Sequence, residues 1–201
     1  MKKVFFISML IITLFMVSCS ETDDSPEVET LSQTEIDDLK FLREEEKLAR
    51  DVYLFSYDKY TQDIFNNISQ SEQQHMDSIL TLLNRYNIDD PASTERGVFI
   101  NQTLQNLYND LIIQSDVSLL EALKVGATIE DLDINDIDDF EDRTDKTDIL
   151  NTYDKLKCGS RNHMRNYYQQ LINDDFIYIV QFISITELTE IINNSNEQCG
   201  N

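Results

Sequence analysis

The histidines and several glutamates of this sequence are spaced so that they can form a metal site. His75 follows Glu72 in the spacing Glu-x-x-His, which puts both side chains on one face of a helix. Glu45, Glu130 and His163 fall on the apolar faces of three other segments with helical periodicity. Buried carboxylates are costly unless they are paired, protonated, hydrogen-bonded or bound to a metal ion. Since oxygen and imidazole ligands together suit iron or manganese, these five residues predict a site for one or two such ions.

Each of these residues also has a structural interpretation. Glu45 lies among basic residues and could be an exposed ion-pair residue, while Glu72 could close a capping box with Ser69. Glu130 begins an acidic run that could be a solvated face. A single core histidine is more often a hydrogen-bonded structural residue than a ligand. Two histidines opposite glutamates favour metal binding over that interpretation.

Four long segments with helical periodicity must position these side chains. They span about residues 32–60, 62–86, 118–140 and 147–173, and shorter helices are expected at 103–114 and after Ser184. The first two and the last two long segments are joined by a few residues, whereas residues 87–117 form a long connection. This pattern is typical of ferritin-like four-helix bundles with one long crossover. We therefore predict an all-α fold of this kind with short extra helices.

Composition agrees with a helical protein and excludes one class of partner. The 201 residues favour one domain, and only 4 Gly and 2 Pro make a turn-rich β fold a poor interpretation. Lys and Arg number 16 against 38 Asp and Glu, so the formal net charge is −22. Because binding to a nucleic-acid backbone needs clustered cations, nucleic acid is not an expected partner. An oligomer is compatible with the sequence.

The N-terminus predicts export and a lipid anchor. Lys2 and Lys3 precede an apolar run, Val4–Val17, that is shorter than the ~20 residues of a membrane-spanning helix. The run ends at Ser18 and Cys19, which resembles a bacterial lipobox and implies lipidation of Cys19; an ordinary signal peptide is the alternative. A lipoprotein of the bacterial cell envelope, periplasmic or surface-exposed, is the resulting expectation. The predicted divisions are a signal peptide at 1–18, a flexible acidic tether at 19–31, the bundle at 32–192 and a tail at 193–201.

Two further cysteines, Cys158 and Cys199, lie in the predicted mature chain. An extracytoplasmic location permits a disulfide between them, although the sequence does not show their connectivity. Neither cysteine has the spacing of a zinc ligand.

Four stretches of the chain resemble DUF2202, a ferritin-like family of unknown function, over about Leu31 to Ile192. The resemblance to the wider superfamily implies a Glu on the first and third helices and Glu-x-x-His on the second and fourth. Ser160 departs from this pattern, because it stands where the second Glu-x-x-His would have its Glu. An asymmetric site is therefore expected, and Asp133 could supply a substitute oxygen. The matching stretches are Arg43–Tyr53, Ser71–Asp77, Leu123–Glu130 and Gly159–Arg165.

Two classes of function follow from the sequence. The first is a ferritin-like protein whose metal ions react with oxygen or peroxide, or are stored and passed on. The second is a non-catalytic surface lipoprotein that binds a partner and has a structural metal or a metal-free core. Fold alone does not choose between them.

Overall fold

All of the secondary structure in the part of the chain that the structure describes is helical. This structure is a computed structural model, and it describes Met1 and residues 30–200. The all-α prediction is confirmed, and each predicted helix is present with its ends within a few residues of the expected positions. The helices are α1 (Gln33–Tyr60), α2 (Asp63–Arg85), α3 (Gln102–Ser115), α4 (Leu119–Glu141), α5 (Thr147–Asn173) and α6 (Ile185–Asn193).

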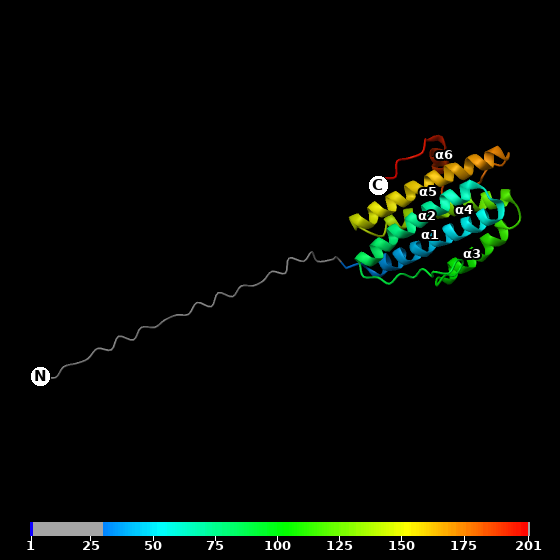
Figure 1. Ribbon diagram of the computed structural model, residues 1–201. Helices are drawn as coiled ribbons and strands as arrows, with labels where there is room; N and C mark the ends of the chain where they lie inside the picture. Colours follow the sequence, from blue (N-terminus) through cyan, green and yellow to red (C-terminus); the bar gives the residue numbers. More distant parts are fainter. Residues whose placement is uncertain (2–29, 201) are drawn as a thin grey trace.

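The four long helices lie side by side and form a helical bundle (Figure 1). Helices α1 and α2 form one hairpin, and α4 and α5 form another; residues 86–118, which contain α3, cross between the hairpins. Helix α3 packs on α1 and α4, and α6 packs on α5 (Figure 1). As a result α1 has neighbours on three sides, namely α2, α3 and α4.

Side-chain caps determine where several helices begin. At the start of α1, Ser32 and Glu35 form a capping box: the Glu35 backbone N–H donates to the Ser32 hydroxyl at 3.2 Å, and the Ser32 N–H donates to the Glu35 carboxylate at 2.7 Å. Ser118 and Ser184 cap α4 and α6, and each hydroxyl accepts one hydrogen bond from a backbone N–H.

A polar layer crosses the middle of the bundle between two apolar clusters. One cluster includes Leu39, Ile79 and Tyr153, near one end of the four long helices. The other includes Val52 and Tyr167, near the opposite end. Each long helix places at least one buried acidic or histidine residue between these two clusters, among them Glu46, Glu72 and His163. Water-excluding packing therefore covers the polar layer on both sides.

The crossover covers the outer face of α1 through a buried ion pair. Lys47 is fully buried, and its Nζ donates to the Asp51 carboxylate at 2.5 Å and to the Glu95 carbonyl at 2.9 Å. The Gly97 N–H donates to the same Asp51 carboxylate at 2.8 Å. Gly97 has a φ of 75°, which favours glycine. The centre of α1 therefore has no solvent-facing side.

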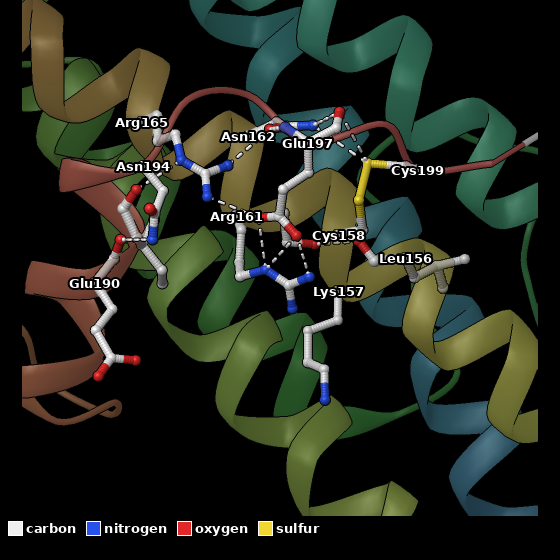
Figure 2. Close-up of polar contacts among 12 residues, drawn as sticks. Leu156, Lys157, Cys158, Arg161, Asn162, Arg165, Glu190, Asn194, Glu197 and Cys199 are labelled. Carbon is white, nitrogen blue, oxygen red and sulfur yellow. Dashed lines mark hydrogen bonds and ion pairs between the residues drawn. A yellow bond between two sulfur atoms is a disulfide. The ribbon is translucent and has the colours of Figure 1, made fainter.

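The C-terminal tail is fastened to α5 by a disulfide and by ion pairs (Figure 2). Cys158 and Cys199 are joined, with their Cα atoms 5.4 Å apart. The Glu197 carboxylate accepts hydrogen bonds from Arg161 at 2.5 Å and from Arg165 at 2.6 Å. These cations lower the pKa of Glu197 to about 2, because they favour its charged form. The sequence had left this disulfide open.

The predicted signal peptide, the lipidation site Cys19 and nearly all of the predicted tether lie outside the described residues. Among the residues that are described, no helix has the length and apolar character needed to cross a bilayer.

Candidate metal centre

One glutamate on α2 connects the two histidines of the chain. The Glu72 Oε2 atom lies 2.8 Å from His75 Nδ1, one turn along the same helix. Its Oε1 atom lies 2.9 Å from His163 Nδ1 on α5. Each carboxylate oxygen of Glu72 therefore faces a different imidazole. A carboxylate in this position can bridge two neighbouring metal ions.

A second carboxylate completes each half of the cluster. On one side Glu46 Oε2 lies 3.2 Å from His75 Nδ1, and on the other Glu130 Oε2 lies 3.3 Å from His163 Nδ1. Ligand atoms of Glu46, Glu72 and His75 lie within 4.8 Å of one another, and the same holds for Glu72, Glu130 and His163. All five residues are buried. The two groups share Glu72, so the geometry is that of two adjoining three-residue sites.

The structure brings together four of the five predicted ligands but directs Glu45 elsewhere. Glu44, Glu45 and Glu46 are all buried, because neighbouring elements surround the centre of α1. Glu44 accepts hydrogen bonds from the backbone N–H groups of Ile100, at 2.6 Å, and Asn101, at 2.9 Å. Glu45 faces α4, and Glu46 faces His75. A helical wheel drawn with one apolar face selects the middle glutamate, Glu45. Helix α1 is buried on three faces, so its neighbouring glutamates are buried as well.

Asp133 on α4 adds another carboxylate beside Ser160. The Ser160 hydroxyl donates a hydrogen bond to Asp133 Oδ2, and both residues are buried. Asp133 faces Glu46, Glu130 and Glu72, and these like charges add to burial in raising its pKa well above the usual value. The acidic groups around the two histidines thus include Asp133 as well as the three carboxylates of the cluster.

The outer edge of each imidazole is also held in place. His163 Nε2 is hydrogen-bonded to the Ser71 hydroxyl at 2.9 Å, which leaves Nδ1 directed at the carboxylates. His75 Nε2 lies against Gly159, where an added Cβ would be only 2.5 Å from that nitrogen. The rings of His75 and His163 stack with their centroids 5.6 Å apart. Such outer contacts orient histidine ligands in metal sites.

Burial and mutual interaction shift the pKa of every cluster member. Burial lowers the pKa of both histidines, but the facing carboxylates outweigh it: His75 rises well above its usual value and His163 rises to about 10. Burial raises the pKa of Glu46 to about 7 even though His75 opposes it, and it also raises that of Glu130. For Glu72 the two histidines outweigh burial and lower the pKa. Without a metal, the cluster retains protons at neutral pH.

Two tyrosines cover the cluster on its apolar side. The Tyr53 hydroxyl donates a hydrogen bond to Glu130 Oε1 at 2.5 Å, and its ring lies 5.4 Å from that of Tyr167. Burial, together with the charge of Glu130, raises the pKa of both hydroxyls well above the usual value. Tyr53 therefore stays protonated and orients the Glu130 carboxylate.

The donor set fits iron or manganese. Glu46 Oε1 and Asp133 Oδ1 are buried without a hydrogen-bond partner, which is unusual for a carboxylate oxygen in a packed core. Metal coordination would satisfy such oxygens. Glu46, Glu72, Glu130 and Asp133, when ionised, carry the four negative charges that balance two divalent ions. The spacing Glu-x-x-His identified Glu72 and His75, whereas no spacing signal distinguishes Glu46 from its two neighbours.

The fold and the cluster together define a class of protein: helical bundles with a buried carboxylate–histidine cluster near the middle of their long helices. The chain belongs to the family described as "Uncharacterized protein domain (DUF2202)", which matches residues 35–195. It is 48% identical over 169 residues to "Uncharacterized protein MJ0754" of Methanocaldococcus jannaschii, covering 84% of this chain and 91% of that protein. A solved structure titled "Crystal structure of hypothetical protein MJ0754 from Methanococcus jannaschii DSM 2661" has a TM-score of 0.83 at 48% identity, covering 84% of this chain and 97% of that chain. The DUF2202 assignment is thus confirmed.

Proposed function

We propose that the protein is a ferritin-like metal-binding protein whose buried centre holds a pair of iron or manganese ions. The observation that carries the proposal is Glu72, whose two oxygens lie 2.8 and 2.9 Å from the two histidines. Glu46 and Glu130 flank this arrangement on opposite sides. The two helical hairpins and the long crossover favour the ferritin-like bundle.

The surrounding residues suit a metal-dependent redox or metal-handling role. An iron or manganese pair, when bound, supplies electron exchange with oxygen or peroxide. Glu46, Glu72, His75, Glu130 and His163 would hold the ions, with Glu72 common to both three-residue groups. Tyr53 holds a proton against Glu130, and the apolar clusters exclude water.

The membrane anchor at Cys19 and the location in the bacterial cell envelope are part of this proposal. They rest on the resemblance of the N-terminus to a lipoprotein signal. A surface or periplasmic location would expose the protein to external metal ions and to peroxide.

A metal-free structural core is the second candidate, and one observation favours it. With the raised pKa values of His75 and His163, both imidazoles are protonated in the metal-free state and form ion pairs with Glu72. A core of this kind could stabilise a non-catalytic surface lipoprotein that binds a partner. Metal content distinguishes the two candidates.

The test is metal analysis of the purified chain after anaerobic incubation with Fe²⁺ or Mn²⁺. We expect close to two ions per chain, and His75→Ala or His163→Ala should reduce this number while helical circular dichroism is retained. The control is Asn162→Ala. Asn162 is next to His163 on α5, but its side chain bonds to the tail, so this variant should bind metal like wild type. If the folded wild-type chain bound neither ion, the metal-binding proposal would be refuted and the metal-free structural core would remain.

A further inference from the structure

Glu45 is a buried acid that the metal centre does not use. Its side chain lies at the interface of α1 and α4, and the residue is 2% exposed. Neither of its carboxylate oxygens receives a hydrogen bond from an N–H or hydroxyl group. The charged groups that act on it are the carboxyl groups of Asp136, Asp133 and the adjacent Glu46. A carboxylate placed among other carboxylates in a core requires a cation or a proton.

Asp136 leads from Glu45 to the surface. It is half-buried and lines an open pocket of about 560 Å³ between α1, α4 and the crossover. Four acids and two bases line this pocket, and one of the bases, Arg143, is paired with Asp38 at 3.3 Å. The pocket is therefore acidic overall. Its acids are Asp37, Asp38, Glu44 and Asp136, and its bases are Lys40 and Arg143.

Asp133 leads from Glu45 to the metal centre. It lies one helical turn before Asp136 on α4, and its carboxyl group interacts with those of Glu45 and Glu46. Its Oδ1 atom is buried without a hydrogen-bond partner. Asp136, Glu45 and Asp133 thus form an acidic row that begins at an open pocket and ends at the cluster around Glu72.

We propose that the acidic row is the entry path for divalent cations, with Glu45 and Asp136 as a transfer site between the pocket and the buried centre. This inference rests on the proposed function. The row offers only carboxylate oxygens, which hold a partly hydrated Mn²⁺ or Fe²⁺ more weakly than a site that adds imidazole nitrogen. An ion would therefore move from the row to the histidine cluster. An acidic cleft with low-dielectric walls also raises the local concentration of cations and speeds their capture.

The test is the rate at which metal-free protein takes up Mn²⁺, followed after rapid mixing by a metallochromic indicator. Glu45→Gln and Asp136→Asn should each slow uptake about tenfold or more. The number of ions bound at equilibrium should not change. Asp136 is half-buried, so its variant keeps the test valid if the Glu45 variant fails to fold.

Two control variants separate entry from binding. Asp154→Asn removes one charge from an exposed position of α5 away from the pocket, and it should leave the uptake rate unchanged. Glu46→Gln alters the residue next to Glu45, and it should lower the equilibrium number of ions instead.

The outcomes separate this inference from the proposed function. Wild-type uptake rates in both folded entry variants would overturn the entry path and leave the metal centre intact. Loss of bound metal at equilibrium in Glu45→Gln would also overturn it, because Glu45 would then be a ligand of the centre. A folded wild type that takes up no Mn²⁺ or Fe²⁺ would refute the metal centre, and the entry path with it.

Discussion

Ser160 on α5 donates a hydrogen bond to Asp133 on α4, in the middle of the bundle. The serine stands where a second Glu-x-x-His would have its glutamate, and the absence of that carboxylate predicted an asymmetric site. In the structure an aspartate from the neighbouring helix presents its carboxylate at this position. The acid is supplied by a different helix, so the charge around the histidines is retained.

Asp133→Asn is therefore expected to lower the bound metal from about two ions per chain towards one, because it removes one of four carboxylates. Ser160→Ala keeps that carboxylate and should bind metal nearly as wild type does. Ser160→Glu should add no metal, and it should destabilise the fold by ~1–3 kcal/mol because it overpacks the core beside Asp133. Elemental analysis of folded samples checks all three variants. A higher metal content in Ser160→Glu than in wild type would contradict this account.

Gly159→Ala tests how closely α5 approaches His75. Alanine normally stabilises a helix interior by ~1 kcal/mol relative to glycine. Here the new Cβ would lie 2.5 Å from Nε2 and 2.8 Å from Cε1 of His75, so the ring must move. We expect metal affinity to fall about 10- to 100-fold, as it does when outer contacts of ligands are altered. Metal titration measures this change.

Gly126→Ala is the matched comparison for that variant. Its Cβ would meet the ring of Tyr167 and overpack the same core without touching a histidine. It should lower stability more than metal affinity. Equal losses of affinity in both variants would show that general overpacking, and not displacement of His75, causes the effect.

The pH dependence of the metal-free protein follows from the raised pKa values. Burial raises the pKa of Glu46 from 4.5 to about 7, and the facing carboxylates raise that of His163 from 6.5 to about 10. Between its unfolded and folded pKa values, each of these groups holds more protons in the folded state than in the unfolded state. The free energy of unfolding therefore falls as pH rises through both ranges. Each such proton changes the free energy of unfolding by ~1.4 kcal/mol per pH unit. Glu72 acts oppositely, and its contribution is lost only as pH falls below about 4.5.

Urea unfolding of the metal-free chain should therefore give a lower free energy of unfolding at pH 8 than at pH 5. Bound metal displaces these protons, so metal should stabilise the fold more strongly at pH 8. Glu46→Gln should flatten the dependence between pH 5 and 7. Equal stability of the metal-free chain at both pH values would rule out the proton-retaining cluster.

Periodicity predicted the helices well, because an amphipathic helix is specified by nearby residues. The Glu-x-x-His spacing likewise identified Glu72 and His75, since both sit on one helix. Glu46 could not be distinguished from Glu45 by such reasoning. Their side chains differ by about 100° around a helix that is buried on three sides, and only the packed neighbours decide which one meets His75. The pairing of Cys158 with Cys199 likewise depends on where the tail folds back.

Cys19→Ser tests the proposed membrane anchor, which lies outside the described residues. Without the thiol the chain cannot be lipidated, so it should no longer partition into the detergent phase after extraction of bacteria that express it. Metal binding by the bundle should be unaffected. Wild-type protein that fractionates as a free soluble species would contradict the lipoprotein prediction.

The disulfide between Cys158 and Cys199 should contribute substantially to stability. It closes a loop with a sequence separation of 41, and loop closure of this size stabilises a fold by ~4 kcal/mol in the chain-entropy model. Replacing both cysteines by serine should lower the free energy of unfolding in urea by up to that amount. It should also free the tail, so that Arg161 and Arg165 lose Glu197 and proteolysis removes residues after α6 (Figure 2). Because the tail bonds to the outer side of α5, the metal content should stay at the wild-type value. Treating wild type with a reductant should reproduce the loss of stability, and two freely titratable thiols in the untreated wild-type protein would disprove the pairing.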